Sequence, residues 1–280
     1  MMGEIFETQV FIESLKKHDH HSFTCLFNET GGKIFNLAYR MIGNEEDASD
    51  ITQNTFLQVY QHIDSFRGDS RLSTWIFAIA RNQCFQRLNQ TRRTTFDDFE
   101  KLIENEKDEA CLDELTEPEK QHLILQVKEG CLTGLVRCLP FNQRMAFILH
   151  ILLHLPVIDV SMILNKSTGA TKVLIHRSKK NLKQFLCKNC SLYHPDNACR
   201  CENLIGFSIK NNWIFKEKNK DQTLPDAKVI EDEVQNFKEI IRFYQDLSPA
   251  NPSQELPAQI KTLIQNKNWE IFNPKKSVTF

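Results

Sequence analysis

The chain has 280 residues, of which 41% are hydrophobic and 25% charged, so it can bury one or two cores and is not a disordered tail. Its formal net charge of -1 argues against a uniformly basic nucleic-acid binder, and no apolar run approaches the roughly 18 residues that a membrane span requires. Nine cysteines, an odd number, favour thiols or metal ligands over a disulfide framework, and with no signal peptide in Met1 to Val10 we expect a cytoplasmic protein.

The near-zero net charge hides a segregated pattern. The segment from Lys166 to Lys188 carries seven Lys or Arg and no Asp or Glu, whereas Thr95 to Lys120 carries eleven Asp or Glu against three Lys. Local charge is therefore more informative than net charge.

At the N-terminus, the first twenty residues predict a short helix followed by a His-rich break at Lys17 to His21. The three histidines could hold a metal, but no partner motif lies nearby, so a solvated turn is the preferred interpretation. A second helix is expected from Ser22 to Met41, interrupted near Gly31 and Gly32.

The next helix has a clear start, because Asn44 is a good N-cap and three acidic residues follow it in the first turn. One face is apolar and predicts a core: Ala48, Ile51, Thr55, Phe56, Val59 and Ile63. The other face is a polar strip of short side chains, Asp47, Asp50, Gln53, Asn54 and Gln58, which is either solvated or meets another protein.

A loop, FRGDSR, leads from this helix to a second helix. The apolar residues of that helix recur at helical spacing: Leu72, Trp75, Ile76, Ile79 and Ala80. Its arginines project away from that stripe. Arginines with interspersed amides are side chains that bind phosphates and base edges. The segment thus predicts contacts with two partners, a protein and a polyanion.

GNEEDASDITQNTFLQVY followed by FRGDSRLSTWIFAIARN resembles region 2 of the extracytoplasmic-function sigma factors of the sigma-70 family. The resemblance implies that residues 1–94 bind core RNA polymerase and open the −10 promoter element. Gln86 and Asn89 depart from the charged residues usual in the family. The implied polymerase contacts are Asp47, Asp50, Gln53, Asn54, Phe56 and Gln58; the implied DNA contacts are Arg67, Asp69, Ser70, Arg71, Arg81, Asn82, Arg87, Arg92 and Arg93.

Residues 95–121 are acidic and lose periodicity, with Pro118 as a breaker, so they predict a linker. Two interpretations stay open. The linker is an inert tether, or, as the resemblance implies, it mimics a nucleic acid inside the polymerase.

Residues 122–186 predict a second helical domain that ends in a helix-turn-helix: Val157 to Leu164, a tight turn at Asn165-Lys166, and Ser167 to Phe185. Its place between LPFNQRMAF and HRSKKNL resembles sigma region 4, which binds the −35 element. Leu174 stands where the family usually has Arg. The expected DNA contacts are Ser167, Thr168, Thr171, Lys172, His176, Arg177 and Lys179.

A Cys-rich module is expected over residues 187–215, where Cys187, Cys190, Cys199 and Cys201 can close a tetrahedral zinc site. A thiol redox switch and four unconnected cysteines are the alternatives, and His194 could replace one ligand. We expect one Zn and no organic cofactor. The scattered Cys25, Cys84, Cys111, Cys131 and Cys138 are interpreted mostly as small core residues.

The tail, residues 216–280, predicts an amphipathic helix over Ala227 to Leu247 and a shorter one near Ala258 to Asn266. Such a tail cannot bury its apolar stripe alone, so we expect it to dock within the chain. One hypothesis is that it restrains the DNA-binding helix until a signal arrives.

Together these patterns predict an all-α protein with two helical domains, a linker, a Cys-rich module and a helical tail. The resemblance implies a sigma factor that directs promoter-specific transcription initiation, modulated by its Cys-rich extension. Its partners would be bacterial core RNA polymerase, promoter DNA and an anti-sigma factor, without membrane insertion. The alternative is a metal- or redox-responsive helix-turn-helix regulator, or a simple repressor, that acts without core polymerase. No catalytic motif is present, so no enzyme is expected.

Overall fold

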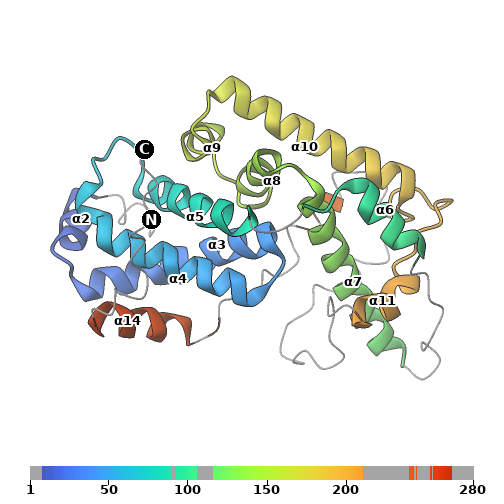
Figure 1. Ribbon diagram of the computed structural model, residues 1–280, viewed down its shortest axis with the longest axis horizontal. Coiled ribbons are helices and arrows are strands. Elements are labelled where there is room, and N and C mark those ends of the chain that lie inside the picture. The colour runs from blue at the N-terminus through green and yellow to red at the C-terminus, as the bar shows by residue number, and fades with distance from the viewer. Residues whose placement is uncertain are drawn as a thin grey trace. The chain divides into compact units, whose positions relative to one another are not determined.

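In the computed structural model the described residues form helices joined by turns and loops, together with an isolated bridge between Cys190 and Cys199 (Figure 1). The predicted all-α fold class is confirmed. None of the described helices combines the length and apolarity that a bilayer span needs. The chain divides into unit 1, Met1–Arg87 with Ala250–Phe280, and unit 2, Leu88–Pro249. The described residues are 8–89, 93–105, 116–210, 240–242, 244, 253 and 255–266.

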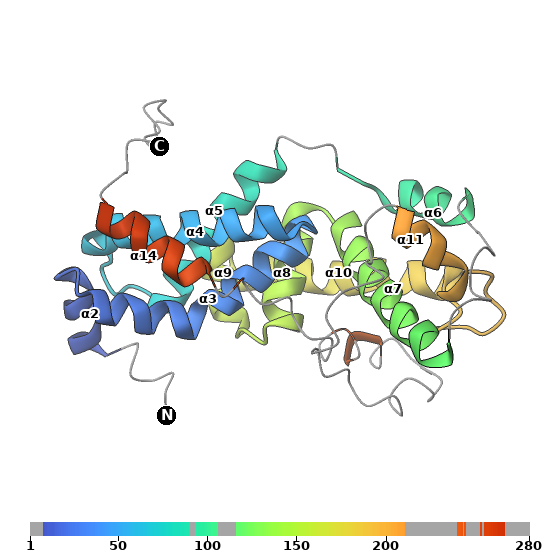
Figure 2. The ribbon, with the colours of Figure 1, turned by 90° about the horizontal axis from the view of Figure 1, so that it is seen from below.

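Unit 1 is a set of helices packed around the pair α3 and α4, with the C-terminal α14 lying along that pair (Figure 2). Its elements are α2 (Gln9–Lys16), α3 (His20–Ile42), α4 (Glu45–His62), the 3₁₀ turn η1 (Ile63–Ser65), α5 (Leu72–Leu88) and α14 (Leu256–Asn266).

The core of unit 1 follows the predicted apolar stripes. Ile34, Leu37 and Met41 of α3 and Val59 of α4 are fully buried. The expected interruption at Gly31 is wrong, because α3 continues through it. A Cβ on Gly31 would lie 2.9 Å from the Phe27 ring, so this glycine leaves room for the ring to pack flat along the helix.

The His-rich break is a turn between α2 and α3, as the preferred interpretation predicted. Asp19 is the N-cap of α3 and accepts a hydrogen bond from the Ser22 amide at 2.8 Å. The His18 ring packs on Tyr60, 4.6 Å between ring centroids. Within the described residues no group of three His, Cys, Asp or Glu side chains is spaced to hold a metal.

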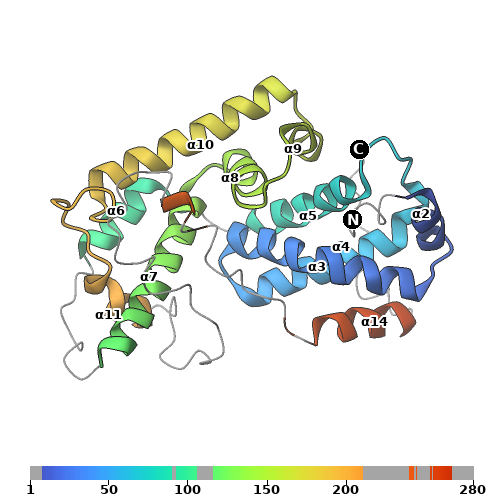
Figure 3. The same ribbon diagram turned by 180° about the vertical axis from the view of Figure 1, so that it is seen from behind.

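Unit 2 is built on α7, which packs against α6 and α11 (Figure 3), and on α8 and α10, which pack together. Its elements are α6 (Phe96–Asn105), α7 (Glu117–Cys138), α8 (Phe141–Phe147), the π-helical η2 (Ile148–Leu152), α9 (Val157–Leu164), α10 (Thr168–Asn189), the 3₁₀ turn η3 (Glu202–Leu204) and α11 (Ile205–Lys210).

The predicted linker is partly folded, which corrects the sequence-based expectation. α6 lies within it and buries Phe99 and Ile103, while Glu100 forms an ion pair with Lys188 at 2.8 Å. The Phe99 and Phe185 ring centroids are 5.9 Å apart. α6 is therefore amphipathic. Its apolar stripe, Phe99 and Ile103, docks on the rest of unit 2, and its acidic residues lie outside that stripe.

Pro118 does not break a helix either, since it occupies the first turn of α7, where proline is tolerated. The Glu119 carboxylate accepts hydrogen bonds from the Thr116 amide at 2.8 Å and hydroxyl at 2.7 Å, which fixes the start of the helix.

The tail meets both units. Tyr244 is buried in unit 2, and its hydroxyl lies 3.1 Å from the Thr133 hydroxyl of α7. α14 packs on α3 and α4 in unit 1. The tail therefore docks within the chain, as expected, but most of the predicted helix over Ala227 to Leu247, together with Trp213, lies outside the described residues.

The docking of α6 predicts that Phe99→Ala lowers the stability of unit 2 by about 3 kcal/mol, because it removes a buried ring. Asp97→Ala, an exposed change on the same helix, is the matched control and should cost less than about 0.5 kcal/mol. Urea unfolding of the full-length variants measures both. Equal stabilities would mean that α6 is a tether and not part of the fold.

Candidate functional site

The polar strip of α4 is defined as Asp47, Asp50, Gln53, Asn54 and Gln58; Asp50 is exposed and the other four residues are partly buried. The Asn44 side chain caps α4 by accepting from the Asp47 amide at 2.9 Å, as the sequence predicted. The cap and the buried opposite face fix the rotation of the helix, so the strip is presented by a rigid element.

Two carboxylates of this strip differ in their surroundings. Asp47 accepts a 2.6 Å hydrogen bond from Arg87 of α5, which raises the pKa of that arginine. The pKa of Asp50 is raised by partial burial, then by the neighbouring charges of Asp47 and Glu46. Asp50 thus carries its charge at a cost in folding free energy.

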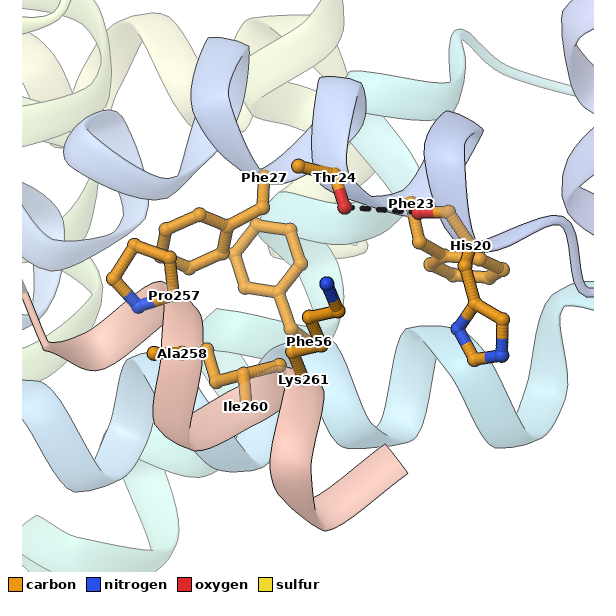
Figure 4. A pocket seen from close by; sticks show the side chains of 9 residues that line it. All are labelled: His20, Phe23, Thr24, Phe27, Phe56, Pro257, Ala258, Ile260 and Lys261. Carbon is orange, nitrogen blue, oxygen red and sulfur yellow. Dashed lines mark hydrogen bonds between the residues drawn. The ribbon is translucent and has the colours of Figure 1, made fainter. Parts of the chain in front are cut away.

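Phe56, the remaining predicted polymerase contact, does not belong to the exposed strip. It is 2% exposed, and its ring lies 4.9 Å from that of Phe27. Figure 4 shows both rings beside α14, so in this structure Phe56 is covered.

The loop between α4 and α5 presents a short charged surface. Arg67, Asp69 and Arg71 are exposed and Ser70 is half-exposed. Gly68 has φ +80°, which favours glycine. The loop is held at its base, where Phe66 packs on Trp75 and Lys16 donates to the Phe66 carbonyl at 2.9 Å. Local sequence patterns give no signal for this Lys16 contact.

The predicted DNA residues of α5 and beyond have several environments. Asn82 is exposed, and Arg81 is half-buried and donates to it at 3.2 Å. Arg87 is shared with Asp47, so it is an ion-pair partner as well as a surface cation. Arg93 is exposed in unit 2, and Arg92 lies outside the described residues.

In unit 2, α9 and α10 form the predicted helix-turn-helix, and α9 has the predicted bounds. Asn165 takes a left-handed conformation with φ +51°, and its amide bonds back to the Met162 carbonyl at 3.0 Å. The Ser167 side chain then accepts from the Ala170 amide at 3.1 Å, which caps α10.

α10 has a buried side and a cationic side. Ile175, Leu182 and Phe185 are buried, and the exposed residues that the sequence predicted for DNA are Ser167, Thr168, Lys172, His176, Arg177 and Lys179. The prediction for Thr171 is wrong, because its side chain is fully buried and its hydroxyl donates to the Ser167 carbonyl at 3.0 Å. The exposed side of α10 is suited to a phosphate backbone.

The Cys-rich segment follows α10 directly. The backbones of Cys190 and Cys199 form the isolated bridge. The side-chain amide of Asn197 donates hydrogen bonds to the Cys187 and Cys190 carbonyls at 3.1 Å each. Burial raises the pKa of Cys201 to about 12 and raises that of Cys190. Cys187 is exposed.

Cys131 of α7, interpreted from the sequence as a core residue, lies beside this cluster. Burial raises its pKa well above the usual value, and nearby Cys190, Cys201 and Cys199 raise it further. Cys84 and Cys138 are buried, as predicted, whereas Cys25 is half-exposed and lies 3.6 Å from His21. Cys111 lies outside the described residues.

The family model for sigma-70 region 2 matches residues 26–94, which extend from α3 through the polar strip and the loop to the end of α5. The ECF RNA polymerase sigma factor SigW of Bacillus subtilis is 28% identical over 179 residues, covering 62% of this chain and 94% of that protein. This chain is thus similar to an ECF sigma factor over almost the whole length of that relative.

A second relative agrees. The sigma-E factor of Escherichia coli is 29% identical over 181 residues, covering 64% of this chain and 94% of the relative. Each relative is thus matched almost entirely, while about a third of this chain lies outside each match.

Two solved structures are also similar. CnrH in complex with the cytosolic domain of CnrY matches with a TM-score of 0.46 and 18% identity, covering 63% of this chain and 95% of that one. The sigma factor RpoE in complex with the anti-sigma factor NepR from Bartonella quintana has a TM-score of 0.40 and 18% identity, covering 57% and 94%.

The raised pKa of Asp50 predicts that Asp50→Asn increases the melting temperature at pH 7, by about 1 °C. Folding raises this pKa, so the ionised carboxylate costs stability above it, and the cost vanishes below about pH 3.9, the unfolded value. Thermal unfolding from pH 7 to pH 4 should show the difference shrinking. A variant less stable than wild type at pH 7 would indicate a stabilising contact of Asp50 instead.

Proposed function

We propose that this chain is an ECF sigma factor of the sigma-70 family and that it binds bacterial core RNA polymerase through the polar strip of α4. In this proposal the 66–71 loop and α5 contact the −10 promoter element, and α10 contacts the −35 element. The protein would act in the cytoplasm as an initiation factor, with no catalytic step of its own.

The observation that carries the proposal is that the region 2 match includes a polar strip that remains accessible to solvent outside the core of unit 1. The match spans α3 to α5, and within it Asp50 and Asn54 stay on the outer side of α4 while Thr52 and Val59 are buried. A charge kept at the surface at a cost in stability is typical of a binding site.

The DNA side is supported by charge. Lys166, Lys172, Arg177 and Lys179 are exposed on α10 or its preceding turn, in a segment without acidic residues. Cations on one side of a helix supply the salt-dependent part of affinity for DNA. The near-zero net charge of the whole chain is compatible with DNA binding by α10, because the acidic residues of α6 lie on a different helix.

Run-off transcription with purified core polymerase and promoter DNA tests the function. We expect a defined transcript only when the sigma factor and core are both present. The second candidate, a helix-turn-helix regulator favoured by the cysteine cluster next to α10, would instead bind promoter DNA without core and give no transcript.

In the same assay, Lys172→Ala should reduce promoter binding by the holoenzyme by about tenfold and lower its salt slope by about 1. Gln184→Ala, an exposed uncharged change on the same helix, is the matched control and should behave as wild type. Indistinguishable salt slopes for the two variants would remove α10 from the DNA interface.

We further propose that one Zn²⁺ draws together Cys190, Cys199, Cys201 and Cys131, with Cys131 in place of the sequence-predicted Cys187; in this structure the four thiols are not yet spaced to hold a metal. Four thiolates suit zinc, and the bridge between Cys190 and Cys199 brings two of them together. Cys131 is supported by its position beside the other three thiols, whose charges add to the larger effect of burial in raising its pKa. Lys128 of α7, which is buried, favours the thiolate forms of Cys190 and Cys201.

Zinc content per chain, measured on the full-length protein, tests this set of ligands. Cys131→Ser should weaken zinc binding about 100-fold or more, whereas Cys187→Ser should leave one zinc per chain. The reverse result would support the sequence-predicted set, and a wild type without zinc would contradict a metal site altogether.

A further inference from the structure

The C-terminal helix α14 is anchored on unit 1 by an apolar stripe. Leu256 and Ile260, one turn apart, are 1% and 4% exposed, whereas Ala258 and Gln259 between them are exposed. Leu263 continues the stripe at the spacing of a helix face and is half-buried. The stripe packs on α4 and α3, as the views in Figures 1 and 2 agree.

The surface beneath α14 is aromatic. Phe23 and Phe27 of α3 and Phe56 of α4 line the contact with Pro257 and Ile260 (Figure 4). The Phe27 and Phe56 rings meet edge to face, and Phe23 lies 4.8 Å from the Tyr60 ring. Without α14, part of this cluster would face water, and exposed aromatic clusters on a soluble protein are usually binding surfaces.

The covered cluster and the polar strip are on one helix. Phe56 is one turn from Gln53, so a protein that contacts the strip at Gln53 would lie next to the α14 contact. Two helices cannot occupy the same surface of α4. A partner that needs Phe56 must displace α14.

The α14 contact is less complete than a protein core. A pocket of about 160 Å³ remains between α14 and the rings, lined also by His20, Thr24 and Lys261. Because this pocket is partly open to solvent, the aromatic rings are not enclosed by protein atoms on all sides, and the lining atoms lose some dispersion contacts. The contact therefore favours reversible docking, helped by the high effective concentration of a helix on the same chain.

We propose that α14 occupies part of the surface through which α4 binds core RNA polymerase, so that the C-terminal helix competes with the polymerase. The proposal rests on the polymerase-binding function proposed above for α4. The sequence suggested that the tail restrains the DNA-binding helix α10. In the present proposal the tail restrains the polymerase-binding helix α4 instead.

The test is the affinity of full-length variants for purified core RNA polymerase. Ile260→Asp places a charge against the aromatic rings and should release α14, so the affinity should rise about tenfold. Gln259→Asp makes the same substitution on the exposed side of the same helix and should change the affinity less than twofold.

A chain that ends at Pro249 removes α14 entirely and guards against an Ile260 variant that only shifts the helix. Tighter binding by both altered chains supports the competition. Equal or weaker binding by the truncated chain overturns it while leaving the proposed function intact. If no form binds core polymerase, the proposed function itself fails, and the competition fails with it.

Discussion

The packing of α4 against its neighbours is the interaction on which the rest of unit 1 depends. One side of α4, including Ala48, Thr52 and Val59, is buried, and this fixes which residues remain outside. The polar strip is thus a consequence of packing on the opposite side of the helix. Phe56 is also buried, where it packs on Phe27 and lines the contact with α14.

The tail has a contact close to the cysteine cluster in unit 2. Thr133 is two residues from Cys131 on α7, and its hydroxyl lies 3.1 Å from that of Tyr244. Only eleven residues separate Tyr244 from Leu256, the first residue of α14.

Local signals predicted the elements whose reasons are local. The caps at Asn44 and Ser167 and the apolar period of α4 and α9 are readable because each depends on residues within one or two turns. The docking of α6 was missed because its stripe is only Phe99 and Ile103 among acidic residues, and its partner Phe185 is 86 residues away from Phe99. Threonine is a residue type that often contacts DNA, but the orientation of α10 about its axis buries the Thr171 side chain. Cys131 and α14 likewise depend on partners that are distant in sequence.

The competition proposed for α4 requires one surface shared by α14 and the polymerase. Hydrogen–deuterium exchange of this protein alone and with core polymerase tests it most directly. We expect the amides of α4 to become more protected in the complex while those of Leu256–Asn266 lose protection. Continued protection of α14 in the complex, together with increased protection of α4, would contradict it.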